Sequence, residues 1–348
     1  MAALHDKASL ESWLTSVWQR RSLTAYLLLP LSILFGALSA LRRILYRVHL
    51  LRSIRLPVPV IIVGNVVVGG TGKTPLVIWL VNAMQQAGFT PGVISRGYGG
   101  NAQTDVREVT SSSSAGQVGD EPLLIAHHAR CPVVVGRDRV AASRALLASH
   151  PAVNVIISDD GLQHYRLQRN VEIVLFDARG GGNRWLLPAG PLRESMSRHR
   201  DITVLNGVET PQGLPPNCLR MQVNGQHAEA LSDRTRRLPL GELSGRITAV
   251  AGIGNPQRFF SMLRGAGLSI DTIALPDHHN FSAKTFSGIT ADVILITEKD
   301  AVKCAGFDSI KNDPRIWVVP VTARVDDALI NLVKDKLILE KSRGYPTA

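Results

Sequence analysis

Residues 59–88 read PVIIVGNVVVGGTGKTPLVIWLVNAMQQAG. The Val/Ile run Pro59–Val68 is typical of a fully buried parallel strand. Thr74–Ala87 has helical periodicity, and Gly88 follows as a stop signal. The loop Gly69–Thr74 joins the two segments and reads GGTGKT. A glycine loop that follows a strand and opens a helix predicts a phosphate-binding P-loop.

The chemistry of this loop suits a nucleoside triphosphate. Glycines let backbone N–H groups close around phosphate oxygens, and the helix N-terminus adds a positive dipole. Lys73 can reach the β- and γ-phosphates, and the Thr74 hydroxyl can ligate Mg²⁺. The strict motif has glycine where this chain has Val67, so a glycine-rich turn with an incidental lysine is the alternative. The predicted nucleotide-binding residues are Gly69, Gly70, Thr71, Gly72, Lys73 and Thr74.

A second pattern points to a magnesium site. The apolar run Val153–Ser158 predicts a strand, and Asp159, Asp160 and Gly161 follow it directly. Charged groups at the ends of parallel strands face the ligand crevice of an α/β sheet. Asp159 and Asp160 are therefore candidate Mg²⁺ ligands. A plain Asp-Gly turn is the alternative.

The rest of the chain alternates strand and helix patterns, which predicts an α/β fold with a parallel sheet. A second, smaller α/β unit begins near Arg246, and Asn224-Gly225 predicts a β-hairpin between Met221–Val223 and His227–Leu231. We therefore expect a P-loop NTPase-like domain, an N-terminal membrane helix and a second domain joined by a hairpin linker. The predicted segments are 1–56 for membrane association, 57–207 for the P-loop domain, 208–243 for the linker and 244–348 for a C-terminal lid.

The N-terminal segment contains 20 residues without a charge, Ser22–Leu41. As a helix this stretch would be about 30 Å long, which matches one hydrocarbon core. Pro30 and Gly36 interrupt it, and membrane helices tolerate both. A membrane helix that spans or lies in the interface is the favoured interpretation. A buried core helix and a cleaved signal peptide are the alternatives.

Composition narrows the class of protein. The 348 residues are 45% hydrophobic and 19% charged, which excludes a disordered, highly charged chain. The net charge is +11, of which residues 1–56 carry +6 around the apolar stretch. This distribution favours an anionic membrane surface over nucleic acid. The three cysteines form no C-x-x-C spacing or even set, which favours a reducing compartment.

Seven motifs of the chain, in order, resemble the tetraacyldisaccharide 4'-kinase family, the lipid A 4'-kinases of Gram-negative bacteria; Gly64-Asn65 and Gly69–Pro75 together form the first of them. The resemblance covers nearly the whole chain, and in this family the absence of glycine at Val67 is normal. The matching segments are Gly64-Asn65, Gly69–Pro75, Ser95–Gly99, Gly119–Pro122, Asp159–His164, Leu187–Glu194, Pro276–His279 and Thr297–Asp300.

The resemblance implies a function. Such an enzyme transfers the γ-phosphoryl group of ATP, with Mg²⁺, to the 4'-hydroxyl of tetraacyldisaccharide 1-phosphate, which forms lipid IVA. Its partners would be this lipid A precursor and the anionic inner membrane at the cytoplasmic face, with no nucleic acid and no obligate protein partner.

The resemblance also implies roles for residues. Asp120 would be the catalytic base, His278 would assist it, and Lys73 would act on the phosphate. Glu194 would join Thr74, Asp159 and Asp160 as a candidate metal ligand. An N-cap is the alternative for Asp120, because Gly-Asp-Glu-Pro is a good capping sequence, and a loop histidine without a role is the alternative for His278. Weaker candidates for substrate or phosphate contact are Tyr98, Arg137, Gln163, His164 and Arg193.

Two other function classes compete with the kinase. One is a membrane-tethered P-loop NTPase switch, and the other is a nucleic-acid-binding ATPase that only the charge suggests. Thr297–Asp300 superficially matches a GTPase base-reading motif, but Glu298 interrupts it. Guanine specificity is therefore not predicted.

Overall fold

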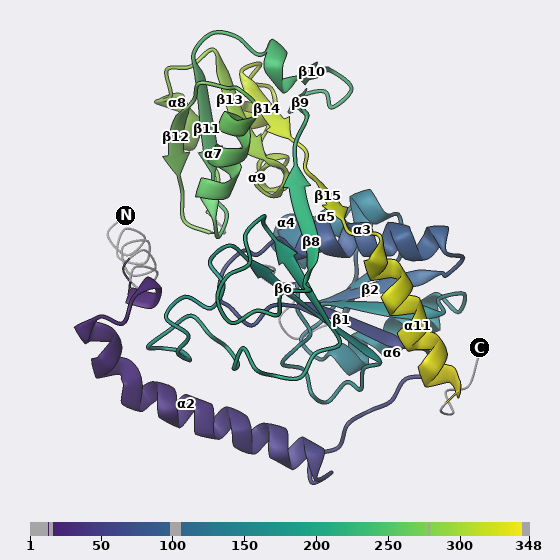
Figure 1. The fold of residues 1–348 in the computed structure, drawn as a ribbon. Helices are drawn as coiled ribbons and strands as arrows, with labels where there is room; N and C mark the ends of the chain where they lie inside the picture. The colour runs from purple at the N-terminus through teal and green to yellow at the C-terminus, as the bar shows by residue number, and fades with distance from the viewer. Residues whose placement is uncertain (1–12, 14–16, 98–105, 278, 343–348) are drawn as a thin grey trace. The chain divides into compact units, whose positions relative to one another are not determined.

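The structure is a computed structural model that describes residues 13, 17–97, 106–277 and 279–342. The chain divides into two compact units, and Figure 1 labels their helices and strands. The division by function that the sequence suggests, into a membrane-associating segment, a P-loop domain, a linker and a lid, remains a prediction. The first unit holds Met1–Lys73, Val153–Met221 and Val325–Ala348, and the second holds Thr74–Ala152 and Gln222–Arg324.

A parallel sheet forms the centre of the first unit, with strands in the order β8-β7-β6-β1-β5. Val63 of β1 lies opposite Asp159 of β5 and Ile173 of β6. The carboxyl ends of these parallel strands therefore reach one edge, where ligands bind in α/β folds. The strands are β1 (Val60–Gly64), β5 (Val155–Asp159), β6 (Val171–Asp177), β7 (Ile202–Asn206) and β8 (Leu219–Asn224).

Helix α2 (Leu23–Arg47) lies on the first unit through one narrow, partly polar face. The Ser32 hydroxyl donates to the carbonyl of Leu186 at 2.8 Å and accepts from the Ala189 amide at 2.9 Å. Among the described residues, α2 is the helix long and apolar enough to cross a membrane. Its leucines are largely exposed, which excludes the alternative of a buried core helix. The exposed leucines of α2 are Leu23, Leu27, Leu31, Leu34, Leu38 and Leu41.

The C-terminal helix α11 (Ala328–Ser342) also belongs to the first unit and packs against β6. Lys336 forms an ion pair with Asp201 at 3.0 Å.

The second unit begins with helix α3, which starts at the end of the glycine loop. Strand β2 pairs in parallel with β4, and β4 pairs antiparallel with β3. These elements are α3 (Lys73–Gln86), β2 (Pro91–Ser95), β3 (Arg107–Glu108), α4 (Ala115–Val118), α5 (Asp120–Ala129), β4 (Val133–Val135) and α6 (Arg139–Ser149).

The same unit contains a six-stranded sheet in the order β10-β9-β14-β13-β11-β12. Successive residues of β11 (Ile247–Ala251) alternate between two apolar cores, with Ala249 on one face and Val250 on the other. Helix α7 (Pro256–Gly265) completes the first core and α8 (Ala283–Ser287) the second. This sheet is covered on both faces, as its apolar strands require.

Apart from β15, the remaining elements of the second unit are strands of that sheet or segments that connect its strands. They are β9 (His227–Ala230), β10 (Arg237–Pro239), the 3₁₀ helix Leu240–Glu242, β12 (Asp271–Ala274), β13 (Val293–Thr297), α9 (Glu298–Cys304), α10 (Asp308–Lys311), β14 (Ile316–Val319) and β15 (Thr322–Val325), whose last residue lies in the first unit.

The predicted α/β class is confirmed, but the predicted pairing across Asn224-Gly225 is wrong. Strand β8 pairs in parallel with β7, and β9 pairs with β10 and β14 instead. The linker hairpin is therefore β9–β10. Gly225 permits a close approach rather than a two-residue turn, because an added Cβ would lie 2.8 Å from Val319 Cγ1.

Candidate active site

The glycine loop has the backbone conformation that its sequence predicts. Gly69 and Gly72 both have φ of +98°, which side-chain-bearing residues rarely adopt. Helix α3 begins at Lys73, so its unpaired N–H groups and positive dipole end lie at the loop. The geometry suits an anion such as a phosphate group.

Asn65 holds both the loop and its lysine. This fully buried side chain donates from Nδ2 to the carbonyls of Val67 at 2.6 Å and Gly69 at 3.2 Å. Its Oδ1 accepts from Lys73 Nζ at 3.1 Å. In the sequence, Asn65 stands out only as part of a family motif, and its role in holding the loop and Lys73 was not predicted. A buried amide directly after a strand that leads into a glycine loop is the signal that could have identified it.

Two more residues that the sequence did not single out support the loop. Asn206, the last residue of β7, donates to the carbonyl of Thr71 at 2.9 Å. Arg179 donates to the carbonyl of Gly70 at 3.1 Å and is itself held by Asp177 at the end of β6. Both supports sit at the carboxyl ends of sheet strands, and only the strand order brings them to the loop.

The predicted acidic pair lies at the same edge of the first unit. Asp159 is buried at the end of β5, and Asp160 follows with φ of +49°. An oxygen of Asp160 lies 3.7 Å from Lys73 Nζ. Arg193 pairs with the same carboxylate at 3.0 Å. The structure thus brings Lys73, Asp160 and Arg193 together.

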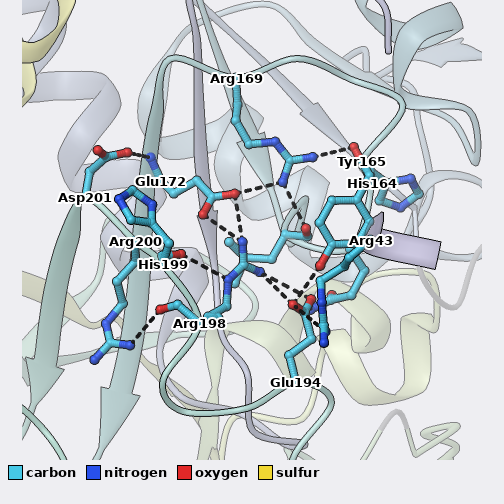
Figure 2. Close-up of polar contacts among 12 residues, drawn as sticks. Arg43, His164, Tyr165, Arg169, Glu172, Glu194, Arg198, His199, Arg200 and Asp201 are labelled. Carbon is cyan, nitrogen blue, oxygen red and sulfur yellow. Dashed lines mark hydrogen bonds and ion pairs between the residues drawn. The ribbon is translucent and has the colours of Figure 1, made fainter. Parts of the chain in front are cut away.

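Glu194 lies in a different group of contacts, which we call the Glu194 network (Figure 2). Its buried carboxylate accepts from Gln163 at 3.0 Å, from the Tyr165 hydroxyl at 2.7 Å and from Arg198 at 3.2 Å. Arg43 of α2 lies 3.6 Å from the same group. Burial, followed by the bond to Glu194, raises the pKa of Tyr165 to about 12.

Arg198 extends the network to Glu172, which also pairs with Arg169 (Figure 2). Arg169 in turn donates to the carbonyl of His164 at 2.6 Å. The Gln163 side chain and the His164 carbonyl therefore take part in hydrogen bonds within the first unit.

Asp120 lies in the second unit at the start of α5, and its side chain is 3% exposed. The N-cap is Gly119, with φ of +91°, so Asp120 is the first helical residue. Its Oδ1 accepts from the Glu121 amide at 2.9 Å. Lys303 and Lys299 lie 3.5 and 3.9 Å from Oδ2. Asp120 therefore sits among charges of α9.

The other predicted residues are less informative. His278 and Tyr98 lie outside the described residues, and Arg137 is exposed. His279 packs edge-on against Phe281, and burial followed by nearby Lys303 lowers its pKa.

The side chains at the sheet edge fit Mg²⁺ in the way that nucleotide sites usually hold it. Mg²⁺ takes one or two carboxylates together with substrate phosphates and water, not a full protein cage. Asp159 and Asp160 supply carboxylates, and the Asp160 amide donates to Val63 O at 2.9 Å, which fixes this turn at the end of β1. In the described part of the chain, no three His, Cys, Asp or Glu side chains form a dedicated metal cage.

Comparison with known proteins gives concordant matches. The family model for tetraacyldisaccharide-1-P 4'-kinase matches residues 24–338. A tetraacyldisaccharide 4'-kinase of Janthinobacterium sp. (strain Marseille) is 59% identical, over 95% of this chain and 97% of its own. One from Herminiimonas arsenicoxydans is 55% identical over 99% of both chains. The crystal structure of LpxK from Aquifex aeolicus in complex with ATP has a TM-score of 0.73 and 28% identity, over 90% of this chain and all of that one.

Proposed function

This chain belongs to the tetraacyldisaccharide-1-P 4'-kinase family, and from that membership we propose which residues carry its reaction. The enzyme is an ATP-dependent lipid A 4'-kinase: it transfers the γ-phosphoryl group of ATP to the 4'-hydroxyl of the acylated disaccharide 1-phosphate. Phosphoryl transfer needs positioning and charge stabilisation more than covalent chemistry from the protein.

Lys73 and the loop Gly69–Thr74 bind the phosphates of ATP in this proposal. The observation that carries it is the position of Lys73, whose ammonium lies between the amide oxygen of Asn65 at 3.1 Å and a carboxylate oxygen of Asp160 at 3.7 Å. Both partners are weak enough for Lys73 to exchange them for phosphate oxygens. Arg193 keeps Asp160 in place with a second positive charge at 3.0 Å.

Mg²⁺ is the metal that we propose for this site, held by Thr74, Asp159 and Asp160. When bound there, it would neutralise charge on the phosphate oxygens. We do not include Glu194, because its oxygens already accept from Gln163, Tyr165 and Arg198.

Asp120 is the proposed catalytic base, with His278 assisting. A sugar hydroxyl is a weak nucleophile until a base accepts its proton. The Asp120 carboxylate accepts from the Glu121 amide through Oδ1 and faces two ammonium groups through Oδ2, surroundings that favour the ionised form.

The proposed location of the enzyme is the anionic surface of the bacterial inner membrane, on the side where ATP is present. The family fits a membrane-associated enzyme, and α2 presents exposed leucines beside basic residues such as Arg42 and Arg47. This combination suits binding to anionic lipid.

A transfer assay tests the proposal. Purified full-length protein is incubated with γ-labelled ATP, Mg²⁺ and the disaccharide 1-phosphate in detergent. We expect label in the lipid, a severe loss of kcat in Asp120→Asn with ATP affinity kept, and weaker ATP binding in Lys73→Met. Label released only as free phosphate would instead favour the NTPase switch. Loss of ATP binding in Asp120→Asn would remove its assignment as the base.

A further inference from the structure

Two lysines of α9 lie against the carboxylate of Asp120. Lys299 and Lys303 are four residues apart, so they share one face of that helix. Their Nζ atoms lie 3.9 and 3.5 Å from Asp120 Oδ2. The Asp120 side chain is 3% exposed, and the two lysines are 17% and 13% exposed. Water and salt therefore screen these attractions only weakly.

Lys303 has a fixed anchor in Asp300. The fully buried Asp300 accepts from the Gly252 amide at 3.0 Å and from the Thr297 hydroxyl at 2.7 Å. Lys303 Nζ lies 3.4 Å from its other oxygen. Thr297 also caps α9, because its oxygen accepts from the Asp300 amide at 3.2 Å. The motif Thr297–Asp300 thus fixes the position of Lys303, which contacts Asp120.

Lys299 is shared among three carboxylates. Besides Asp120, its ammonium lies 3.0 Å from Glu121 and 3.5 Å from Asp277. Burial by itself would lower the pKa of Lys299, but Glu121, Asp120 and Asp277 together raise it. Lys299 therefore remains charged wherever the enzyme is folded and active.

We propose that Lys299 and Lys303 are positioning residues that hold the Asp120 carboxylate ionised and oriented at the start of α5. This inference rests on the proposed role of Asp120 as the base. A buried carboxylate without cations takes up a proton, and it could not then accept another from a hydroxyl. Because each lysine is shared with other acids, Asp120 is not so strongly paired that it loses its basicity.

Several charged or titratable groups surround Asp120, and its titration depends on all of them. Burial, followed by the charge of Lys303, lowers the pKa of neighbouring His279. The group consists of Glu121 on α5, Lys299, Asp300 and Lys303 on α9, and Asp277 and His279 after β12.

The pH dependence of full-length enzyme variants tests the inference. The kcat and the KM for ATP are measured from about pH 5 to pH 9 for Lys303→Gln, Lys303→Arg and a control, Lys311→Gln, which changes an exposed lysine on α10. In Lys303→Gln we expect the acid limb of kcat to move up by about one pH unit, a loss of about tenfold on that limb, with KM for ATP unchanged. Lys303→Arg should restore the wild-type limb, and Lys311→Gln should not alter it.

Asp120→Asn separates two claims: that Asp120 is the catalytic base, and that Lys299 and Lys303 position it. If Asp120→Asn stays active, Asp120 is not the base and the proposed function fails at that residue. If Asp120→Asn is inactive while Lys303→Gln keeps the wild-type pH dependence of kcat, Asp120 keeps its assignment as the base and the positioning role of the lysines is overturned. Should Lys303→Gln not fold, Lys299→Gln provides the same measurement, and an unshifted limb there overturns the proposal equally. In the Asp120→Asn background, adding Lys303→Gln should cause no further loss.

Discussion

Arg193 and Asp160 form an ion pair at 3.0 Å, and the Arg193 amide donates to the carbonyl of Val66 at 2.7 Å. One residue thus contacts both the segment that leads into the glycine loop and the acid that follows β5. Because Lys73 lies 3.7 Å from the same Asp160, Arg193 and Lys73 share one carboxylate.

Replacing Arg193 should therefore weaken ATP binding. Arg193→Ala removes one of the two cations that share Asp160, and the tighter pair of Asp160 with Lys73 then competes with phosphate for the lysine. We expect the KM for ATP to rise by about three- to tenfold, which is on the order of 1 kcal/mol for a partly exposed pair. The control is Arg184→Ala, which changes an arginine bonded to Gln212 at 3.1 Å. A KM equal to that of the wild type would show that Arg193 does not influence Lys73.

Glu194→Gln should affect stability rather than magnesium binding. The substitution removes the buried charge that Arg198 and Arg43 face, but Arg198 keeps its ion pair with Glu172, so we expect a cost on the order of 1–3 kcal/mol. We expect a lower melting temperature and an unchanged Mg²⁺ concentration for half-maximal activity. Asp160→Asn is the comparison, because it should raise that concentration. A raised Mg²⁺ requirement in Glu194→Gln at normal stability would make Glu194 a metal ligand.

The two faces of α2 should respond differently to substitution. Leu27 and Leu34 are 72% and 55% exposed and lie seven residues apart on one side of the helix. Changing both to serine should reduce co-sedimentation with phosphatidylglycerol vesicles and leave the melting temperature unchanged. Ser32→Ala should do the reverse, because it removes two hydrogen bonds to Leu186 and Ala189 at a cost of about 1 kcal/mol each. Equal vesicle binding by the double variant and the wild type would refute membrane binding through this face.

The pair of His128 and Glu298 predicts a pH dependence of stability. A hydrogen bond to Glu298 at 2.9 Å is the main cause that raises the pKa of His128 above its ordinary value of 6.5. A raised folded-state pKa stabilises the fold fully below the unfolded pKa, and the stabilisation is lost as pH rises through the folded value.

Thermal melting from about pH 5 to pH 9 should therefore show a stability that falls as the pH rises above 6.5, a fall that His128→Gln lacks. The exposed His127 provides a matched control, because its substitution should keep the wild-type slope. Identical slopes in His128→Gln and the wild type would contradict the prediction.

Much of the first unit follows from local patterns. Val60–Gly64 forms a strand because it is an unbroken apolar run, and Gly69 and Gly72 adopt positive φ because glycine tolerates it. The hairpin at Asn224-Gly225 failed for a physical reason. A turn signal describes only which conformations two residues allow, whereas β8 pairs in parallel with the preceding strand, β7, across the connection formed by residues 207–218.

The sequence by itself determined the glycine loop, the acidic pair Asp159-Asp160 and an apolar N-terminal helix, because each depends on neighbours along the chain. Only the tertiary structure decided which groups surround them. Asn206 reaches Thr71 across 135 residues, and Lys303 reaches Asp120 across 183. Such contacts depend on strand order and helix packing, and no local periodicity encodes them. Glu194 illustrates the difference: the family resemblance makes it a candidate metal ligand, and only the structure shows its arginine partners in the Glu194 network.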